Sequence, residues 1–273
     1  MAADSKDNEK VVLFFDIDNT LYSCKAGVNE LMGKYIKDYI ANTLSLDDES
    51  ADFLHKNYYR QFGLAIEGLV RFNHIDAMDY NHRVDDALPL DTILKPDPLL
   101  RQLLESVDRS KVKIWLFTNA YKTHGNRVVK LLGLDGIFDG LTYCDYAVRP
   151  LVCKPKTVMF KKAMEQAGVS DPSKCYYVDD SALNCDAAVK LGWKYAIHYT
   201  EGVPSNSGRS QIDSLWELPK VVPELFVKDL ADAAIRAREA ADAESKITDG
   251  GSNVNEKDAA RNPADAQAEL VTA

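Results

Sequence analysis

Four mainly apolar runs recur along the chain, each about as long as a β-strand: residues 11–18, 111–119, 175–180 and 193–199. They are apolar on both faces, which is typical of parallel strands covered by helices on each side. The segments between the last three runs have apolar residues at helical spacing and end at Gly133, Gly168 and Gly192. This alternation predicts an α/β fold with a doubly wound, Rossmann-like parallel sheet.

Residues 23–96 interrupt this alternation. Apolar positions recur at helical spacing in 29–44, 51–62, 64–72 and 77–84, and no clear strand lies among them. We therefore expect an all-helical cap domain (23–96), inserted between the first and second strands of a core formed by residues 10–22 and 97–228.

The two ends of the chain differ in composition from the rest. Residues 1–9 form a polar N-terminal tail, and residues 229–273 contain no aromatic side chain. That C-terminal segment holds ten acidic and five basic residues, so it contributes five of the nine net negative charges. We expect it to form a solvated helix followed by disorder. The remainder has no basic stripe, which argues against a nucleic-acid partner.

The chain has 273 residues and is 46% hydrophobic, enough for one substantial core carrying an inserted domain. No apolar run is long enough to span a bilayer or to act as a secretory signal. We expect a soluble protein of the cytoplasm, with the nucleus as an open alternative. The cysteines are odd in number and form no CxxC pair, so we expect reduced packing residues: Cys24, Cys144, Cys153, Cys175 and Cys185.

Polar side chains follow the strands at their carboxyl ends, where open α/β sheets place their functional crevice. The first strand delivers Asp16 and Asp18, and the second delivers Thr118 and Asn119. A later strand delivers Asp179 and Asp180, and Lys154 lies in the loop before the preceding helix. We expect all of these side chains to converge on one crevice.

Four aspartates and one lysine carry a net charge of −3. Like charges about 4 Å apart repel by about 1 kcal/mol in water and about 4 kcal/mol at an effective dielectric near 20. Such a cluster needs a divalent cation, and oxygen ligands suit Mg²⁺ better than zinc or copper. The histidines show no zinc spacing, and we expect them to be structural: His55, His74, His82, His124 and His198.

These residue types suit phosphoryl transfer. Asp16 is the candidate nucleophile, and Asp18 is the candidate general acid and base. Phosphoryl oxygens would be held by the Thr118 hydroxyl, the Asn119 amide and the Lys154 ammonium group. The metal would be held by Asp179 with help from Asp180. Each motif alone also has an ordinary explanation as a turn, a helix cap or a solvated loop. Because the motifs occur in order at the ends of successive strands, we favour a single catalytic site formed by all of them. The alternative is a protein that has kept the fold and lost the activity.

Four motifs carry a family resemblance: DIDNT (16–20), LFTN (116–119), CKP (153–155) and VDDS (178–181). In this order around a helical insertion, they resemble the motifs of the haloacid dehalogenase-like hydrolase superfamily, and the likeness covers residues 10–228. Within it, segments such as YYRQFGLAIEGL, LFTNAYKTH and FDGLTYCDY resemble the fungal pyrimidine 5′-nucleotidase branch.

The resemblance implies a Mg²⁺-dependent phosphatase with a helical cap, acting on nucleoside monophosphates, chiefly UMP and CMP. It implies that Asp16 is the nucleophile and a metal ligand, and that Asp18 also offers its main-chain carbonyl to the metal. Asn19 departs from the glycine common in the superfamily and is interpreted as a mark of the subfamily. Asp18 argues against dehalogenation, because a halide leaving group needs no acid there.

The cap is expected to supply selectivity, because it can close over a substrate and exclude water. Its segment HKNYYRQFG could place an aromatic ring on a base and a cation at a polar edge, through Tyr58, Tyr59, Arg60 and Phe62 beside a turn at Gly63. Packing within the cap is the alternative role for these aromatic residues.

Two other functions stay open. One is a broader phosphatase acting on sugar phosphates or lysophosphatidate, and the other is a non-catalytic binding protein on the same scaffold. The expected partner is a small phosphate ester, with no nucleic acid, no membrane and no obligate protein partner.

Overall fold

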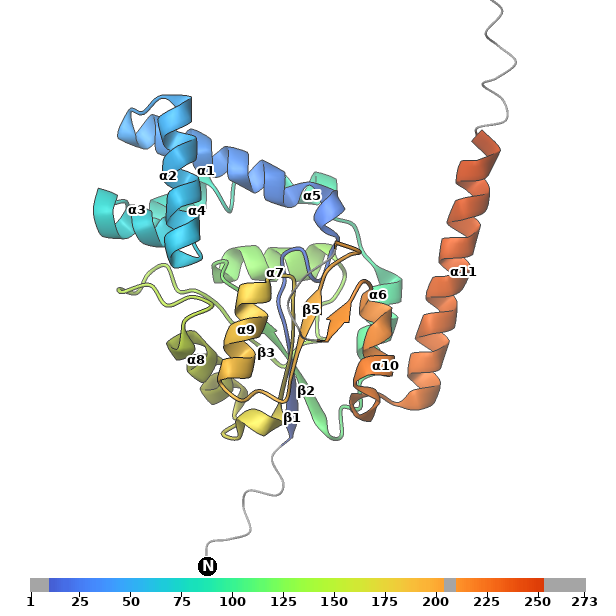
Figure 1. The fold of residues 1–273 in the computed structure, drawn as a ribbon. Coiled ribbons are helices and arrows are strands. Elements are labelled where there is room, and N and C mark those ends of the chain that lie inside the picture. Colours follow the sequence, from blue (N-terminus) through green and yellow to red (C-terminus); the bar gives the residue numbers. More distant parts are fainter. Residues whose placement is uncertain (1–9, 204–209, 253–273) are drawn as a thin grey trace, which may run out of the picture.

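The computed structural model describes residues 10–203 and 210–252, with side chains as far as residue 247. Six parallel strands form one sheet in the order β3-β2-β1-β4-β5-β6. They are β1 Val11–Phe15, β2 Val112–Phe117, β3 Gly140–Thr142, β4 Cys175–Asp179, β5 Tyr195–Tyr199 and β6 Gln211–Ile212 (Figure 1). The predicted doubly wound parallel sheet is confirmed. The two short edge strands, β3 and β6, were not predicted.

Strand β1 lies at the centre of the sheet and is buried on both faces. Its Leu13 and Phe15 belong to one apolar cluster, whereas Val12 and Phe14 belong to another. The first cluster includes side chains of α6 (Pro98–Glu105) and α7 (Lys122–Leu131). The second includes side chains of α8 (Thr157–Ala167) and α9 (Ala182–Lys190). Helices therefore cover both faces, as the continuous apolar runs predict.

The chain crosses from β1 to β2 and β3 on one side, and to β4, β5 and β6 on the other. The change of direction occurs at β1, so the switch point lies between β1 and β4 at their carboxyl ends. The three glycines expected to end the core helices have left-handed backbones, with φ of 69° at Gly133, 69° at Gly168 and 83° at Gly192. Those helix ends are confirmed.

Helices occupy the segment between β1 and β2: α1 Val28–Leu44, α2 Asp48–Phe62, α3 Ala65–Asn73, α4 Ala77–Arg83 and α5 Leu90–Ile93. In Figure 1 they lie beyond the carboxyl ends of the strands. Their apolar cluster includes Ile40 and Tyr80, and it extends to Tyr146 and Cys153 in loops of the core. That residues 23–96 form a domain of their own stays a prediction.

The C-terminal part contributes more to the core than its composition indicated. Helix α11 (Lys228–Ser252) runs beside α6, and its Ala231 and Ala234 are buried (Figure 1). The Arg238 guanidinium lies 4.6 Å from the centre of the Trp216 ring. The predicted polar N-terminal tail (1–9) and the end of the acidic tail (253–273) lie outside the described residues. Within the described residues, no helix combines the length and the apolar composition needed to cross a membrane.

Candidate active site

A cavity of about 920 Å³ lies between the helical insertion and the carboxyl ends of the strands. The core lines it with most of the predicted site residues: Asp16, Asp18, Thr118, Asn119, Lys154 and Asp180. Asp16 follows β1 directly, and its N–H donates to the carbonyl oxygen of Val178 at 2.9 Å, which ties this position to β4. The sheet register therefore brings the sequence-distant motifs together.

Lys154 connects two of these carboxylates. Its Nζ donates to Oδ1 of Asp16 at 2.7 Å, to Oδ2 of Asp179 at 2.7 Å and to the Phe117 carbonyl at 2.8 Å. Burial alone would lower the pKa of this lysine, but the Asp16 and Asp179 carboxylates raise it well above its ordinary value. Lys154 therefore stays a cation and offsets part of the acidic charge.

The ionised form of Asp16 remains unfavourable despite this ion pair. Burial raises the pKa of its carboxyl well above the ordinary value, Lys154 opposes that rise, and the neighbouring aspartates add to it. Carboxylate oxygens of Asp16, Asp179 and Asp180 all lie within 4.8 Å of one another. A single lysine does not neutralise this group, so the arrangement suits a bound cation.

Asp179 and Asp180 differ in accessibility. Asp179 is fully buried, and its oxygens accept hydrogen bonds from Lys154 and from the Tyr177 hydroxyl, the Asn184 amide and the Ser181 N–H. Asp180 is half-buried and lines the cavity. Burial, together with the charge of Asp179, raises the Asp180 pKa to about 7. Asp180 thus offers a more accessible ligand oxygen than Asp179, whose metal contact stays a prediction.

Asp18 is held by two donors on one oxygen. The Tyr22 hydroxyl donates to Oδ1 at 2.7 Å, and Nε2 of His124 lies 2.7 Å from the same atom. Burial acts to raise the Asp18 pKa, but His124 and Tyr22 outweigh it and lower the pKa. Burial likewise acts to lower the His124 pKa, and Asp18 raises it to about 9. Both shifts favour a protonated imidazole facing a carboxylate.

His124 belongs to the site, although the sequence analysis assigned it a structural role. It stands six residues after Thr118, in the first turn of α7, and that helix starts at the carboxyl end of β2. This position was a usable signal, because the first turn after such a strand borders the crevice. Among the described residues no histidine, His124 included, lines the cavity itself, and His124 reaches the site through its contact with Asp18.

Thr118 and Asn119 have different surroundings. Thr118 is buried, and its Oγ1 accepts a hydrogen bond from the N–H of Ala120 at 3.0 Å. The Asn119 side chain is engaged with the main chain of Lys154: its Oδ1 accepts from the N–H at 2.7 Å, and its Nδ2 donates to the carbonyl at 3.0 Å. Asn119 therefore fixes the Lys154 loop, and its predicted contact with phosphate rests on the remaining amide hydrogen.

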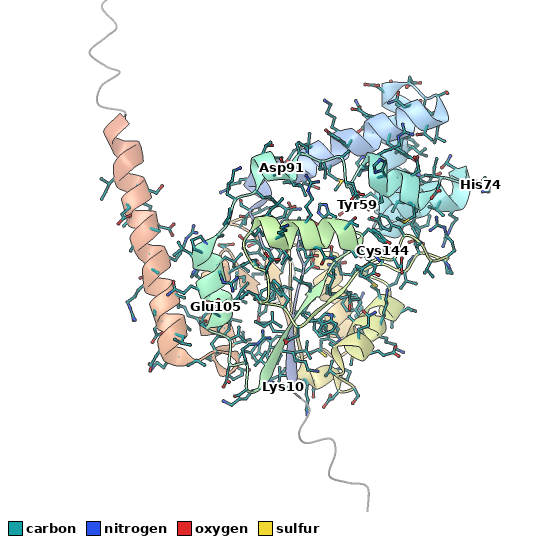
Figure 2. All side chains as sticks on the ribbon, turned by 180° about the vertical axis from the view of Figure 1, so that it is seen from behind. Lys10, Tyr59, His74, Asp91, Glu105 and Cys144 are labelled. Atoms are coloured by element: carbon teal, nitrogen blue, oxygen red, sulfur yellow. The ribbon has the colours of Figure 1, made fainter. Side chains whose placement is uncertain are left out.

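The segment at the end of α2 borders the cavity from the cap side. Tyr59, Arg60, Phe62 and Gly63 line it, and Figure 2 shows Tyr59 where the cap faces the core. Tyr58 does not line the cavity. Its hydroxyl donates to Oδ1 of Asn73 at 2.8 Å, and its ring covers Gly68. The structure thus gives Tyr58 a packing role and does not support its predicted substrate contact.

An ion pair with a buried carboxylate joins the cap to the loop that carries Lys154. Glu67 of α3 is 3% exposed, and it contacts Lys156 and also Arg71, the latter at 3.1 Å. Sγ of Cys153 lies 3.5 Å from Oε2 of Glu67. Cys153 is one of four buried cysteines that form no disulfide, which agrees with the expected packing role, whereas Cys24 is exposed.

The family model described as haloacid dehalogenase-like hydrolase matches residues 11–192. The chain belongs to this hydrolase family. Among its relatives is phosphate metabolism protein 8 of Saccharomyces cerevisiae, which is 40% identical over 204 residues. The alignment covers 71% of this chain and 63% of the yeast protein, less than two thirds of that relative's length. The superfamily predicted from the four motifs is confirmed, with a fungal protein among the relatives.

Solved structures of other proteins share the fold of this hydrolase. A predicted phosphatase from Clostridium acetobutylicum aligns with a TM-score of 0.56 and 20% identity, covering 79% of this chain and 99% of that one. A β-phosphoglucomutase from Clostridium difficile aligns with a TM-score of 0.52 and 15% identity, covering 83% and 99%. At these identities the likeness concerns the fold alone.

Proposed function

We propose that this hydrolase is a Mg²⁺-dependent phosphatase that acts on nucleoside 5′-monophosphates, with UMP and CMP preferred, in cytoplasmic pyrimidine nucleotide metabolism. The observation that carries the proposal is the ion pair of Lys154 with Asp16 beside the hydrogen-bonded pair of Asp18 and His124. It supports a nucleophile, a charge-balancing cation and a proton-transfer group around one cavity. The nucleotide preference rests on the resemblance to the nucleotidase branch.

Asp16 would act as the nucleophile. A carboxylate oxygen attacks phosphorus, the bond from phosphorus to the 5′ oxygen breaks, and an aspartyl-phosphate forms. Water then attacks that phosphorus, which releases inorganic phosphate and restores the carboxylate. In both steps, the Lys154 ammonium group offsets the negative charge of Asp16 and of the phosphoryl group bound to it. The Thr118 hydroxyl and the Asn119 amide are proposed donors to phosphoryl oxygens.

Asp18 would transfer a proton in each of the two steps. Its lowered pKa suits the second step, in which it accepts a proton from the attacking water. The first step needs a proton for the departing 5′ oxygen, and the protonated His124 holds one 2.7 Å from Asp18. We therefore interpret His124 as a positioning residue that keeps Asp18 oriented and supplied with a proton.

The donor set fits Mg²⁺. Asp16, Asp179 and Asp180 offer only oxygen atoms, which hard divalent cations prefer. Asp16 and Asp180 would hold the ion together with the main-chain carbonyl of Asp18, and Asp179 would support them through its contacts with Lys154. When bound, the ion would neutralise charge on the transferring phosphoryl group. From the cap, Tyr59, Arg60, Phe62 and Gly63 remain proposed contacts for the leaving group.

A panel of phosphate esters tests this function with purified protein and Mg²⁺. We expect UMP and CMP to be hydrolysed faster than glycerol phosphate, sugar phosphates and lysophosphatidate. Equal rates across the panel would instead support the broader phosphatase, and no hydrolysis of any ester would support the binding protein. Asp16→Asn is the control, because an amide cannot become phosphorylated; appreciable turnover by this variant would contradict the covalent route.

A further inference from the structure

Asp85 is a buried carboxylate that the proposed mechanism does not use. It lies between α4 and α5, is 3% exposed and lines the cavity that also contains Asp16 and Asp18. Among the residues that the structure describes, none provides a hydrogen-bond donor to its Oδ2. Most buried polar atoms in proteins have a partner, and a buried carboxylate oxygen without one is costly. Such an oxygen in a residue that lines a cavity is explained when a bound ligand supplies the missing donor.

The surroundings of Asp85 are polar and face the same cavity. Tyr80 and Tyr146 also line it, and the Tyr146 hydroxyl lies close enough to the carboxyl group to stabilise its charged form. Burial nevertheless raises the pKa of Asp85 to about 7, with His124 opposing the rise and Asp18 adding to it. His124 thus contacts Asp18 and interacts electrostatically with Asp85. Asp85 and Asp18, the group that would contact the leaving oxygen, line the same cavity.

We propose that Asp85 accepts a hydrogen bond from a hydroxyl group of the leaving group, namely the 2′ or 3′ hydroxyl of the ribose in a nucleoside monophosphate. The inference rests on the proposed phosphatase function. A ribose hydroxyl suits the position, because it stands only a few bonds from the 5′ oxygen, whereas the base lies farther away. Carboxylates are established partners of ribose hydroxyls in nucleotide sites. Asp85 would thereby select phosphate esters of sugars and nucleosides over esters of plain alcohols.

Ribose 5-phosphate and n-pentyl phosphate provide the test, because both are five-carbon esters and only the first carries hydroxyl groups. The readout is the ratio of their kcat/KM values. We expect wild-type protein to favour ribose 5-phosphate, and Asp85→Ala to reduce that ratio by about tenfold or more, the effect of losing a hydrogen bond to a charged group. Asp86→Asn is the matched control, since Asp86 is exposed, bonds to Asn81 and Thr123, and does not line the cavity.

Several outcomes would overturn the inference. They are a wild-type ratio near one, an unchanged ratio in Asp85→Ala, or the same reduction in Asp86→Asn. If Asp85→Ala fails to fold, Asp85→Leu decides, because leucine is similar in size and has no hydrogen-bond acceptor: a lowered ratio supports the subsite, and a wild-type ratio overturns it. The nucleotidase proposal is tested separately by comparing UMP with ribose 5-phosphate in wild-type protein. A preference for hydroxyls without a preference for UMP would refute the nucleotidase proposal and leave the role of Asp85 standing.

Discussion

Nε2 of His124 and Oδ1 of Asp18 lie 2.7 Å apart, and the histidine is buried beneath the cavity wall. The Tyr22 hydroxyl reaches the same oxygen of Asp18, also at 2.7 Å. Two donors on Oδ1 fix the rotamer of this carboxyl group and leave its other oxygen for a substrate. The geometry of the proton-transfer group is therefore set by residues outside the four sequence motifs.

This relationship predicts that His124→Asn impairs protonation of the leaving group more than it impairs binding. We expect kcat on UMP to fall by about ten- to a hundredfold, within the usual contribution of acid–base catalysis. The loss on p-nitrophenyl phosphate should be much smaller, because that leaving group departs with little need of a proton. Steady-state kinetics on both esters checks this. An equal loss of kcat on the two would indicate a merely structural histidine.

The sequence alone was sufficient to predict the centre of the fold and the core of the site. Strand β1 is a continuous apolar run, and such runs form the buried parallel strands whose carboxyl ends define the crevice. Asp16 and Lys154 could therefore be assigned to one place from their positions after or between strands. The edge strands β3 and β6 were missed because strands of three and two residues carry too little pattern to separate them from loops.

Side-chain direction explains the other differences. Tyr58 and Tyr59 are adjacent on one helix, yet only Tyr59 lines the cavity, because consecutive helical residues point about 100° apart. Which of the two faces the core depends on how the cap packs, and periodicity does not specify that. Asp85 was missed for a similar reason: it follows a helix end inside the cap, and only the tertiary fold brings it to the cavity.

The unequal surroundings of Asp179 and Asp180 lead to a second prediction. Asp180→Asn should raise the Mg²⁺ concentration needed for half-maximal activity and leave the melting temperature nearly unchanged, because this side chain is half-buried and lines the cavity. Asp179→Asn should lower the melting temperature as well. Its carboxylate pairs with Lys154, and disrupting a buried ion pair costs about 3–5 kcal/mol.

Mg²⁺ titrations of activity and thermal unfolding of both variants check this difference. Equal losses of stability would show that the Asp179 and Asp180 carboxylates contribute equally to the stability of the fold. A normal Mg²⁺ requirement in Asp180→Asn would remove that residue from the proposed ligand set.

Gly63 gives a third prediction, for which Gly27 serves as the control. Its backbone has φ of +76°, and a Cβ there would lie 3.1 Å from the carbonyl oxygen of Lys154. Gly27 has the same φ of +76° but nothing within 4 Å of its Cβ position. Alanine at either site should cost about 1–2 kcal/mol of backbone strain. Only Gly63→Ala should also push the cap turn against the Lys154 loop and lower kcat.

Urea unfolding and steady-state kinetics of the two variants separate these effects. We expect Gly27→Ala to lose stability with a wild-type kcat, and Gly63→Ala to lose more stability together with activity. If both variants kept a wild-type kcat, the close approach at Gly63 would have no functional consequence.

The raised pKa of Asp85 gives a pH-dependent prediction. Its carboxyl group titrates near 7 in the folded protein and near 3.8 ordinarily, because burial and Asp18 disfavour the charged form. At a pH below both pKa values, the Asp85 carboxyl group is protonated in the folded and in the unfolded protein, so it does not lower the free energy of unfolding. As pH rises from about 4 to about 7, the unfolded chain loses this proton first, so folding stability falls by up to about 1.4 kcal/mol for each pH unit.

Asp85→Asn removes this titration, and we expect the variant to gain stability relative to wild type as pH rises from about 4 to about 7, with the gain constant above that range. Chemical denaturation of both proteins across this range measures the difference, with Asp86→Asn as the exposed control. The groups that face Asp85 are Tyr80, Asp86, His124, Tyr146 and Asp18, and they are the same in both proteins. A difference independent of pH would mean that Asp85 stays charged when folded. A difference that grows with pH would show that the protein keeps this carboxylate at the expense of stability, as expected of a functional group.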